Sequence, residues 1–228
     1  APGQGEAGLP VELEQRAQVL VEALPYIRSF AGKSFVIKYG GSAMVDPGLQ
    51  QQVMTDVVLL KYVGLHPVIV HGGGGEISRW MERLGMEPRF VEGLRVTDGE
   101  TMRVVQMVLV GSVNQALVTL INRLGGRAVG LSGADGDLIL ARKRRFPGRE
   151  DLDLGYVGEV ERVNAGLIRL LEEQGYIPVI SSIGVGPDGE PYNINADTVA
   201  GAVAAAIRAD KLILLTDVRG EIGRASCR

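Results

Sequence analysis

The sequence predicts an α/β fold: a three-layer α/β/α sandwich with a mainly parallel central sheet. Segments with the patterns of strands and helices alternate along the 228 residues, as parallel strands with crossover helices require. Several strand-like segments, at residues 34–39, 66–71 and 176–185, contain continuous apolar runs, which are typical of strands buried on both faces. A hydrophobic content of 46% is enough for a core of this size.

Turn and cap residues set the expected element bounds. Asp46-Pro47 places a capping side chain before proline, so a helix is expected from there to about Tyr62. Thr97 and Glu100 have capping-box spacing and open a long helix to about Leu124. The other expected elements are helices ending near Leu84 and over 164–174 and 196–208, strands over 127–132, 137–144 and 211–218, and a hairpin-like stretch over 86–96.

Residues 11–30 are predicted to form an amphipathic helix that Pro25 kinks. Its apolar residues recur at spacings of four and three and share one face: Leu13, Ala17, Leu20, Leu24 and Ile27. This stripe has to be buried, either against this chain or against a neighbouring subunit.

Composition excludes several classes of function. A net charge of -3 gives no electrostatic footprint for nucleic acid, and the basic run at 142–145 is interpreted as a solvated strand end or loop. Cys227 is the single cysteine, so we expect no disulfide framework and a reducing, cytoplasmic setting. No apolar stretch is expected to reach the length of a membrane span. No cysteine or histidine cluster predicts a metal site.

Lys38 ends the first predicted strand and is followed by Tyr39, Gly40 and Gly41. Ligands of α/β folds bind beyond the carboxyl ends of strands. There, paired glycines expose N–H groups to a phosphate, and a lysine neutralises its charge. A surface lysine before a tight turn explains the same residues equally well.

Four glycines at 72–75 join the second predicted strand to a helix. Their N–H groups would converge at a positive helix terminus, which favours an anion-binding loop. The loop lacks the Lys-Ser/Thr pair of a P-loop and the spacing of a dinucleotide fingerprint. His71 before it is interpreted as a structural histidine.

Two further motifs place polar residues at helix starts. Arg95 can pair with a carboxylate in bidentate fashion, although a solvated arginine is the simpler reading of that motif by itself. Asn193, Asn195 and Asp197 lie within five residues, which is more than capping needs. A lysine, an arginine and glycine loops, without a nucleophile motif, suit phosphoryl transfer.

Six segments resemble, in the same order, those of N-acetylglutamate kinases of the amino acid kinase superfamily, over about residues 10–220. They are VIKYGGSAM (36–44), VIVHGGGG (68–75), GLRVTD (93–98), PVISSIGV (178–185), NINAD (193–197) and LLTDVRG (214–220). The resemblance implies the amino acid kinase fold, N-acetyl-L-glutamate as substrate, and ATP with Mg²⁺. The helix at 11–30 resembles the extra helix of arginine-inhibited members. It implies a homo-oligomer, a dimer or a hexamer, with L-arginine as an effector.

The resemblance also implies a role for each matching residue. Lys38 would stabilise the transferring phosphoryl group, and Asp197 would orient the catalytic lysines. The acyl substrate would be bound by Gly73, Gly74, Arg95 and Asn193. The phosphates and the nucleotide would be bound by Gly40, Gly41, Asp217 and Gly220. The accepting carboxylate is already ionised near neutral pH, so no general base is needed.

The expected organisation has three parts. Residues 1–30 form a tail and the amphipathic helix, 31–209 an acyl-amino-acid lobe, and 210–228 the start of a nucleotide lobe. The family continues beyond this point with a second catalytic lysine, whereas the tail at 221–228 departs from it. The chain is therefore expected to be truncated and, taken by itself, nearly inactive.

Three alternatives stay open. The first is the same chemistry on N-acetyl-aminoadipate in lysine biosynthesis, because one extra methylene changes binding by a few kcal/mol at most. The second is a non-catalytic ligand-binding module. The third and most distant is a dinucleotide-dependent oxidoreductase.

Overall fold

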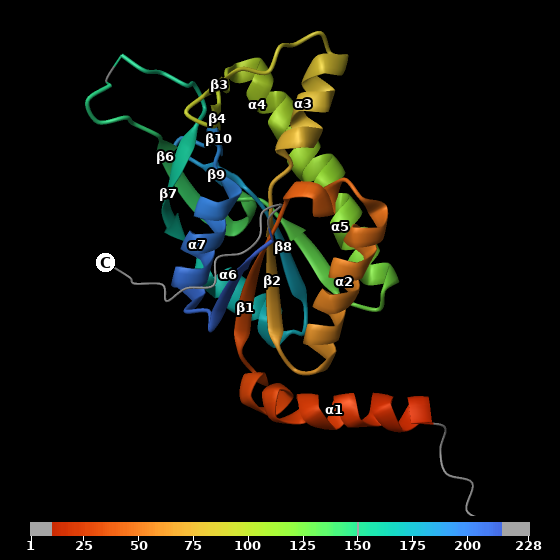
Figure 1. The fold of residues 1–228 in the computed structure, drawn as a ribbon. Coiled ribbons are helices and arrows are strands. Elements are labelled where there is room, and N and C mark those ends of the chain that lie inside the picture. Colours follow the sequence, from red (N-terminus) through yellow and green to blue (C-terminus); the bar gives the residue numbers. More distant parts are fainter. Residues whose placement is uncertain (1–10, 150, 216–228) are drawn as a thin grey trace, which may run out of the picture.

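The computed structural model describes residues 11–149 and 151–215, and within them a five-stranded parallel sheet forms the centre, in the order β11-β1-β2-β8-β5 (Figure 1). β1 and β2 pair from Ser34 with His66 to Tyr39 with His71. Their bounds match the apolar runs that predicted them. The strands are β1 (Ser34–Tyr39), β2 (His66–His71), β5 (Ala128–Leu131), β8 (Ile177–Ser181) and β11 (Lys211–Leu214).

Helices cover both faces of this sheet, as expected. Neighbouring side chains of a strand point to opposite faces, so Val36 packs in the core beneath α6 and α7, and Ile37 packs in the core beneath α2 and α5. Figure 1 shows these two helix pairs on the left and right of the strands. Their bounds are α2 (Pro47–Tyr62), α5 (Gln115–Arg123), α6 (Ala165–Glu173) and α7 (Ala196–Ile207).

A second sheet, in the order β10-β9-β6-β7, lies beyond the carboxyl end of the first. The expectation of one strand over 176–185 was wrong, because the chain leaves the central sheet after Ser181 and enters the second sheet at Ile183. The sequence also gave no sign of β7. These strands are β6 (Ile139–Lys143), β7 (Gly158–Val163), β9 (Ile183–Val185) and β10 (Pro191–Asn193).

The long helix expected after residue 97 is three segments in one run. They are α4 (Gly99–Gln106), a π-helical segment (Met107–Asn114) and α5. The expected cap was wrong by one residue: the Asp98 carboxylate accepts the N–H of Thr101 at 2.8 Å, and Thr97 is buried. The π-helical segment rotates the following side chains about the helix axis relative to an α-helix. A sequence pattern read with a period of 3.6 residues does not predict this rotation.

The run Gly99–Arg123 is long and apolar enough to cross a membrane by length and composition, so the sequence expectation of no such stretch was wrong. In this fold 44% of its most apolar window is buried. Leu109, Leu117 and Ile121 lie in the core, each 1% exposed or less. The apolar character of the run is explained by this packing.

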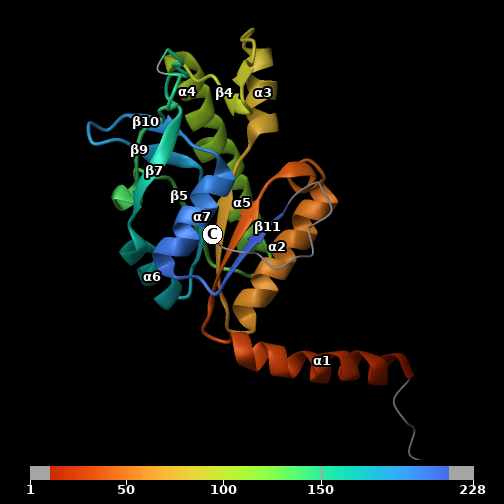
Figure 2. The ribbon, with the colours of Figure 1, turned by 60° about the vertical axis from the view of Figure 1, so that its left-hand side comes forward.

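Helix α1 (Val11–Phe30) projects below the body of the molecule (Figure 2). Its last turn is held by an edge-to-face contact between Phe30 and Phe35, with ring centroids 5.3 Å apart. Leu20 and Leu24 are 70% and 50% exposed, so this chain does not bury the apolar stripe. The side chain of Leu13 lies outside the described residues.

Candidate active site

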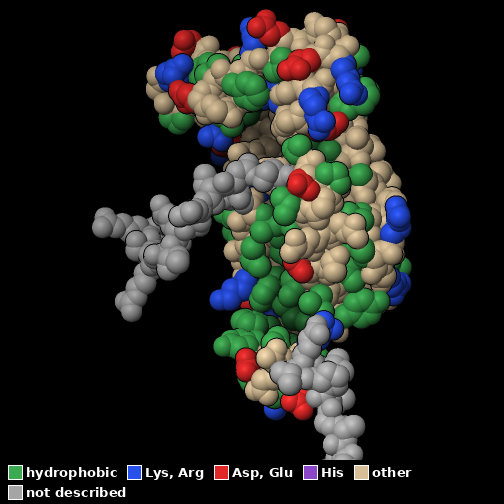
Figure 3. All heavy atoms as spheres, turned by 45° about the vertical axis from the view of Figure 1, so that its right-hand side comes forward, with side chains coloured by type: hydrophobic (Ala, Val, Ile, Leu, Met, Phe, Trp, Pro, Cys, Tyr) green, Lys and Arg blue, Asp and Glu red, His purple; other side chains and the backbone are tan. Residues whose placement is uncertain are grey.

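A cavity of about 740 Å³ opens beyond the carboxyl ends of β1 and β2, below the second sheet. Figure 3 shows the molecule hollowed beneath its upper part. The cavity is lined by residues from all four motifs that the sequence pointed out: Lys38, Gly40 and Gly41; residues 72–75; Gly93 and Arg95; and Asn193, Asn195 and Asp197. Chain folding thus brings together motifs that are up to about 160 positions apart.

Lys38 and Asp197 form an ion pair at the floor of this cavity, with the Lys38 Nζ 3.1 Å from an Asp197 carboxylate oxygen. Asp197 is placed by the first turn of α7, where the Asn195 side chain caps the N–H groups of Asp197 and Thr198. The Lys38 side chain is 15% exposed and that of Asp197 is 52% exposed. Such a half-solvated pair stabilises the fold by about 1 kcal/mol or less, so its main effect is to aim the ammonium group.

Gly40 and Gly41 leave the space beside Lys38 open. A Cβ at Gly40 would lie 2.9 Å from the Lys38 Nζ and displace it. Gly41 has a φ of 68°, which a side chain disfavours. A bulkier residue at either position would therefore change where the lysine points or how the turn closes.

The glycine loop at 72–75 is wedged between two helical segments. A Cβ at Gly72 would lie 3.3 Å from the Ala196 Cβ of α7, and one at Gly73 would lie 2.7 Å from a Leu109 methyl group of the π-helical segment. Gly74 and Gly75 face open space and begin α3 (Gly74–Arg83). The free N–H groups of this first turn give the cavity a wall that favours anionic oxygen atoms.

Arg95 is positioned by a hairpin, β3 (Phe90–Val91) and β4 (Leu94–Arg95). Glu92 and Gly93 both have positive φ, the pattern of a type I′ turn, and this pairs Phe90 with Arg95. The Arg95 guanidinium lies 4.7 Å from the Phe90 ring centroid. It also donates to the Gly74 carbonyl at 2.8 Å and to the Ser78 hydroxyl at 2.9 Å.

Arg95 is 7% exposed, and burial lowers its pKa below the ordinary value. Among the residues that the structure describes, no carboxylate lies within ion-pair distance of it. A buried cation without a counter-ion is costly, so its position at the cavity wall suits an anionic ligand. The guanidinium has five donors, which leaves some for such a ligand.

Asn193 is tied to Arg95 through Thr97, whose linking role the sequence did not indicate. Its amide nitrogen donates to the Thr97 hydroxyl at 3.2 Å, and that hydroxyl donates to the Arg95 carbonyl at 2.8 Å. Thr97 is fully buried. In sequence it looked like a helix cap, so nothing indicated that it links two strands nearly a hundred positions apart.

Thr97→Val is expected to raise the KM for the ligand that Asn193 and Arg95 hold by about five- to tenfold, as the loss of one buried hydrogen bond predicts. The isosteric methyl group keeps the packing but leaves the Asn193 amide without its anchor. Steady-state kinetics with each substrate varied in turn measures this. Thr97→Ser, which keeps the hydroxyl, is the control, and an equal loss in both variants would assign the effect to packing.

Two of the expected site residues, Asp217 and Gly220, lie outside the described residues. The basic run at 142–145 is not part of the cavity: Arg142 pairs with Glu159 and Lys143 with Asp153, both at 2.7 Å. Within the described residues, no group of three or more metal-ligating side chains is present.

The model of the "Amino acid kinase family" matches residues 33–220. The chain belongs to the amino acid kinase family. It is 60% identical to the "Acetylglutamate kinase" of Pelotomaculum thermopropionicum, over 90% of this chain and 72% of that protein.

Two solved structures share this amino acid kinase fold. The smu.665 protein of Streptococcus mutans UA159 is 32% identical with a TM-score of 0.73, over 84% of this chain and 75% of that chain. The N-acetylglutamate synthase of Neisseria gonorrhoeae, solved with coenzyme A and N-acetyl-glutamate, is 25% identical with a TM-score of 0.78, over 92% of this chain and 47% of that chain. In this kinase the cavity lies at the carboxyl ends of parallel strands, the general ligand position in α/β sheets.

Proposed function

We propose that this amino acid kinase transfers the γ-phosphoryl group of ATP to the side-chain carboxylate of N-acetyl-L-glutamate, a step of arginine biosynthesis. One observation carries the proposal: one cavity holds a buried Arg95, which has no carboxylate partner among the described residues, and, at its floor, a Lys38 aimed by Asp197. A dicarboxylate substrate fits this arrangement, because one carboxylate can pair with Arg95 while the other faces Lys38. The 60% identity to an acetylglutamate kinase supports the same substrate.

The proposed reaction is an in-line displacement. An oxygen of the side-chain carboxylate attacks the γ-phosphorus, the bond from that phosphorus to the β–γ bridging oxygen breaks, and ADP leaves. Lys38 offsets the charge on the equatorial oxygens, and the N–H groups at Gly40 and Gly41 contact the phosphates. Mg²⁺ enters as part of the MgATP substrate. Asp217 and Gly220 belong to the proposed nucleotide side.

The acyl substrate is held by groups on the opposite wall. Arg95 and Asn193 bind the α-carboxylate end, and the N–H groups of Gly73 and Gly74 face the reacting end. The nucleophile is ionised near neutral pH, so the site needs no base. Catalysis then depends on positioning and on electrostatic stabilisation.

The test is to measure acyl phosphate formation by the full-length product of the gene, with hydroxylamine as the trap. N-acetyl-L-glutamate and N-acetyl-L-aminoadipate are compared side by side. We expect a higher kcat/KM with N-acetyl-L-glutamate. A clear preference for the longer acid would place the protein in lysine biosynthesis instead.

Helix α1 is proposed to join subunits, with L-arginine as an effector, and the enzyme is proposed to act in the cytoplasm. The support is the exposure of the apolar face of α1, where Leu20 and Leu24 are 70% and 50% exposed. Deleting residues 1–25, which keeps the Phe30–Phe35 contact, is expected to lower the assembly from a hexamer to dimers and to weaken arginine inhibition.

Light scattering and arginine titration measure both effects. Leu20→Glu is the matched point variant, because it places a charge on the exposed face without shortening the chain. An unchanged mass in both variants would contradict an assembly role for α1.

A further inference from the structure

His71 is a buried histidine that lies behind the glycine loop and does not line the cavity. Its Nδ1 is 3.0 Å from the Gly72 carbonyl oxygen, and its Nε2 is 3.0 Å from the Asn114 amide nitrogen. The same amide nitrogen donates to the Val179 carbonyl at 2.9 Å. The two side chains therefore connect the end of β2, the end of the π-helical segment and β8.

Two backbone carbonyl groups determine which nitrogen atoms of the His71 and Asn114 side chains carry the bonding hydrogens. A carbonyl oxygen accepts, so Nδ1 of His71 carries the hydrogen that goes to Gly72, and the Asn114 nitrogen must face Val179. Nε2 of a neutral ring is then an acceptor, which matches the second hydrogen of the Asn114 amide. Burial lowers the pKa of His71 to about 4, so the ring is neutral at physiological pH.

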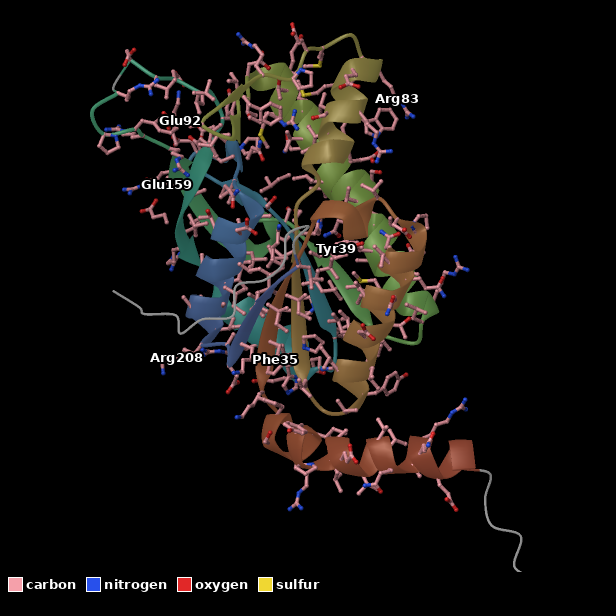
Figure 4. All side chains as sticks on the ribbon, in the orientation of Figure 1. Phe35, Tyr39, Arg83, Glu92, Glu159 and Arg208 are labelled. Atoms are coloured by element: carbon pink, nitrogen blue, oxygen red, sulfur yellow. The ribbon has the colours of Figure 1, made fainter. Side chains whose placement is uncertain are left out.

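The surrounding chain is shaped around this pair. A Cβ at Gly130 would overlap the amide oxygen of Asn114, so the side chain fits only because β5 has a glycine there. From the same π-helical segment, Leu109 and Val113 lie 2.7 Å and 3.4 Å from where a Cβ of Gly73 would be. One segment thus backs the glycine loop by packing and anchors it by hydrogen bonding. Tyr39, labelled in Figure 4, pairs with His71 across β1 and β2 at this end of the sheet.

We propose that His71 and Asn114 are positioning residues that set the orientation of the Gly72 peptide and, through it, of the Gly73 and Gly74 N–H groups that face the acyl substrate. The inference rests on the proposed function for the identity of that substrate. The mechanism is a fixed tautomer: Asn114 donates to Nε2, which keeps the hydrogen on Nδ1, where it holds the Gly72 carbonyl. The loop glycines alone have too much backbone freedom to hold one orientation.

Two substitutions of His71 separate the two contacts. In His71→Asn, the side-chain amide nitrogen takes the position of Nδ1, so a donor for the Gly72 carbonyl is kept. The amide of His71→Gln reaches the place of Nε2, keeps an acceptor for Asn114 and loses the donor. We expect His71→Gln to lower kcat/KM for N-acetyl-L-glutamate by about 10- to 100-fold, as a displacement of catalytic groups by about 1 Å does. His71→Asn retains most of the activity, and the KM for ATP stays nearly unchanged in both.

Asn114→Asp tests the tautomer itself. An ionised aspartate accepts and does not donate, so it draws the hydrogen to Nε2 and leaves Nδ1 without a hydrogen for Gly72. The chain has two histidines, so ¹⁵N NMR of the imidazoles resolves His71, with His66 as the internal reference. We expect an Nδ1–H ring in the wild type at pH 7 and an Nε2–H ring in Asn114→Asp, with the same loss of kcat/KM as in His71→Gln.

Val105→Ala is the stability control, because it truncates a fully buried side chain in α4 that does not line the cavity. It is expected to lower Tm while leaving kcat/KM unchanged.

Wild-type kcat/KM in His71→Gln, or an equal loss of kcat/KM toward ATP and toward the acyl substrate, would overturn the inference. If the wild type makes no acyl phosphate, the proposed function fails, and the inference is then judged by NMR. In that case, unchanged amide resonances of residues 72–74 in His71→Gln would overturn it.

Discussion

Lys38→Ala in the full-length gene product is expected to lower kcat by about two orders of magnitude or more, the loss typical of removing one preorganised electrostatic group. The Lys38 ammonium lies at the cavity floor, 3.1 Å from the Asp197 carboxylate that aims it. Because this pair is half-solvated, its removal costs about 1 kcal/mol of folding stability or less, and Tm is expected to change little.

Lys33→Ala is the matched control for this experiment. Lys33 lies just before β1, at the opposite end of the strand from the cavity, and its contact with Asp210 at 3.8 Å is exposed. The substitution Lys33→Ala removes one positive charge, as Lys38→Ala does, from the same part of the chain. A near-normal kcat in Lys38→Ala, or an equal loss in both variants, would remove Lys38 from the mechanism.

Arg95→Lys is expected to raise the KM for N-acetyl-L-glutamate by about 10- to 100-fold, with a much smaller effect on the KM for ATP. The guanidinium already binds the Gly74 carbonyl and Ser78, and stacks on Phe90. A lysine keeps the charge and loses the planar fork that pairs with a carboxylate. The loss of a charge-assisted bidentate pair, about 1.5–3 kcal/mol, gives this range.

Arg83→Lys is the control for Arg95. Arg83 also stacks on an aromatic ring, with its guanidinium carbon 5.1 Å from the centre of Trp80, but it points outward from α3 (Figure 4). It is expected to leave both KM values unchanged. If Arg95→Lys raises the KM for ATP instead, Arg95 lies in the nucleotide half of the site.

The parts of the fold that local sequence encodes could be predicted. Asp46-Pro47 caps α2 as expected, with the Asp46 carboxylate 2.7 Å from the Gly48 nitrogen. The apolar runs at 34–39 and 66–71 became β1 and β2. The glycine and polar motifs at strand ends met in one cavity, because parallel strands bring their carboxyl ends to the same edge.

The parts that depend on distant contacts could not be predicted. The residues that orient the site act on partners far away in the sequence, as Asn114 does on His71 and Thr97 does on Asn193. The chain changes sheets at Ser182 within the strand-like segment 176–185, where no proline or glycine marks a turn at the point of change. The stripe on α1 was recognised, but its own chain leaves it exposed.

The most direct test of the account is the rate of acyl hydroxamate formation when the full-length gene product is incubated with MgATP, N-acetyl-L-glutamate and hydroxylamine. We expect hydroxamate and ADP in equal amounts, at a rate on the order of 1–100 per second, and both reduced together in Lys38→Ala. ADP formed without hydroxamate, or no ADP with any N-acetylated dicarboxylic amino acid, would contradict the proposed phosphorylation of a carboxylate.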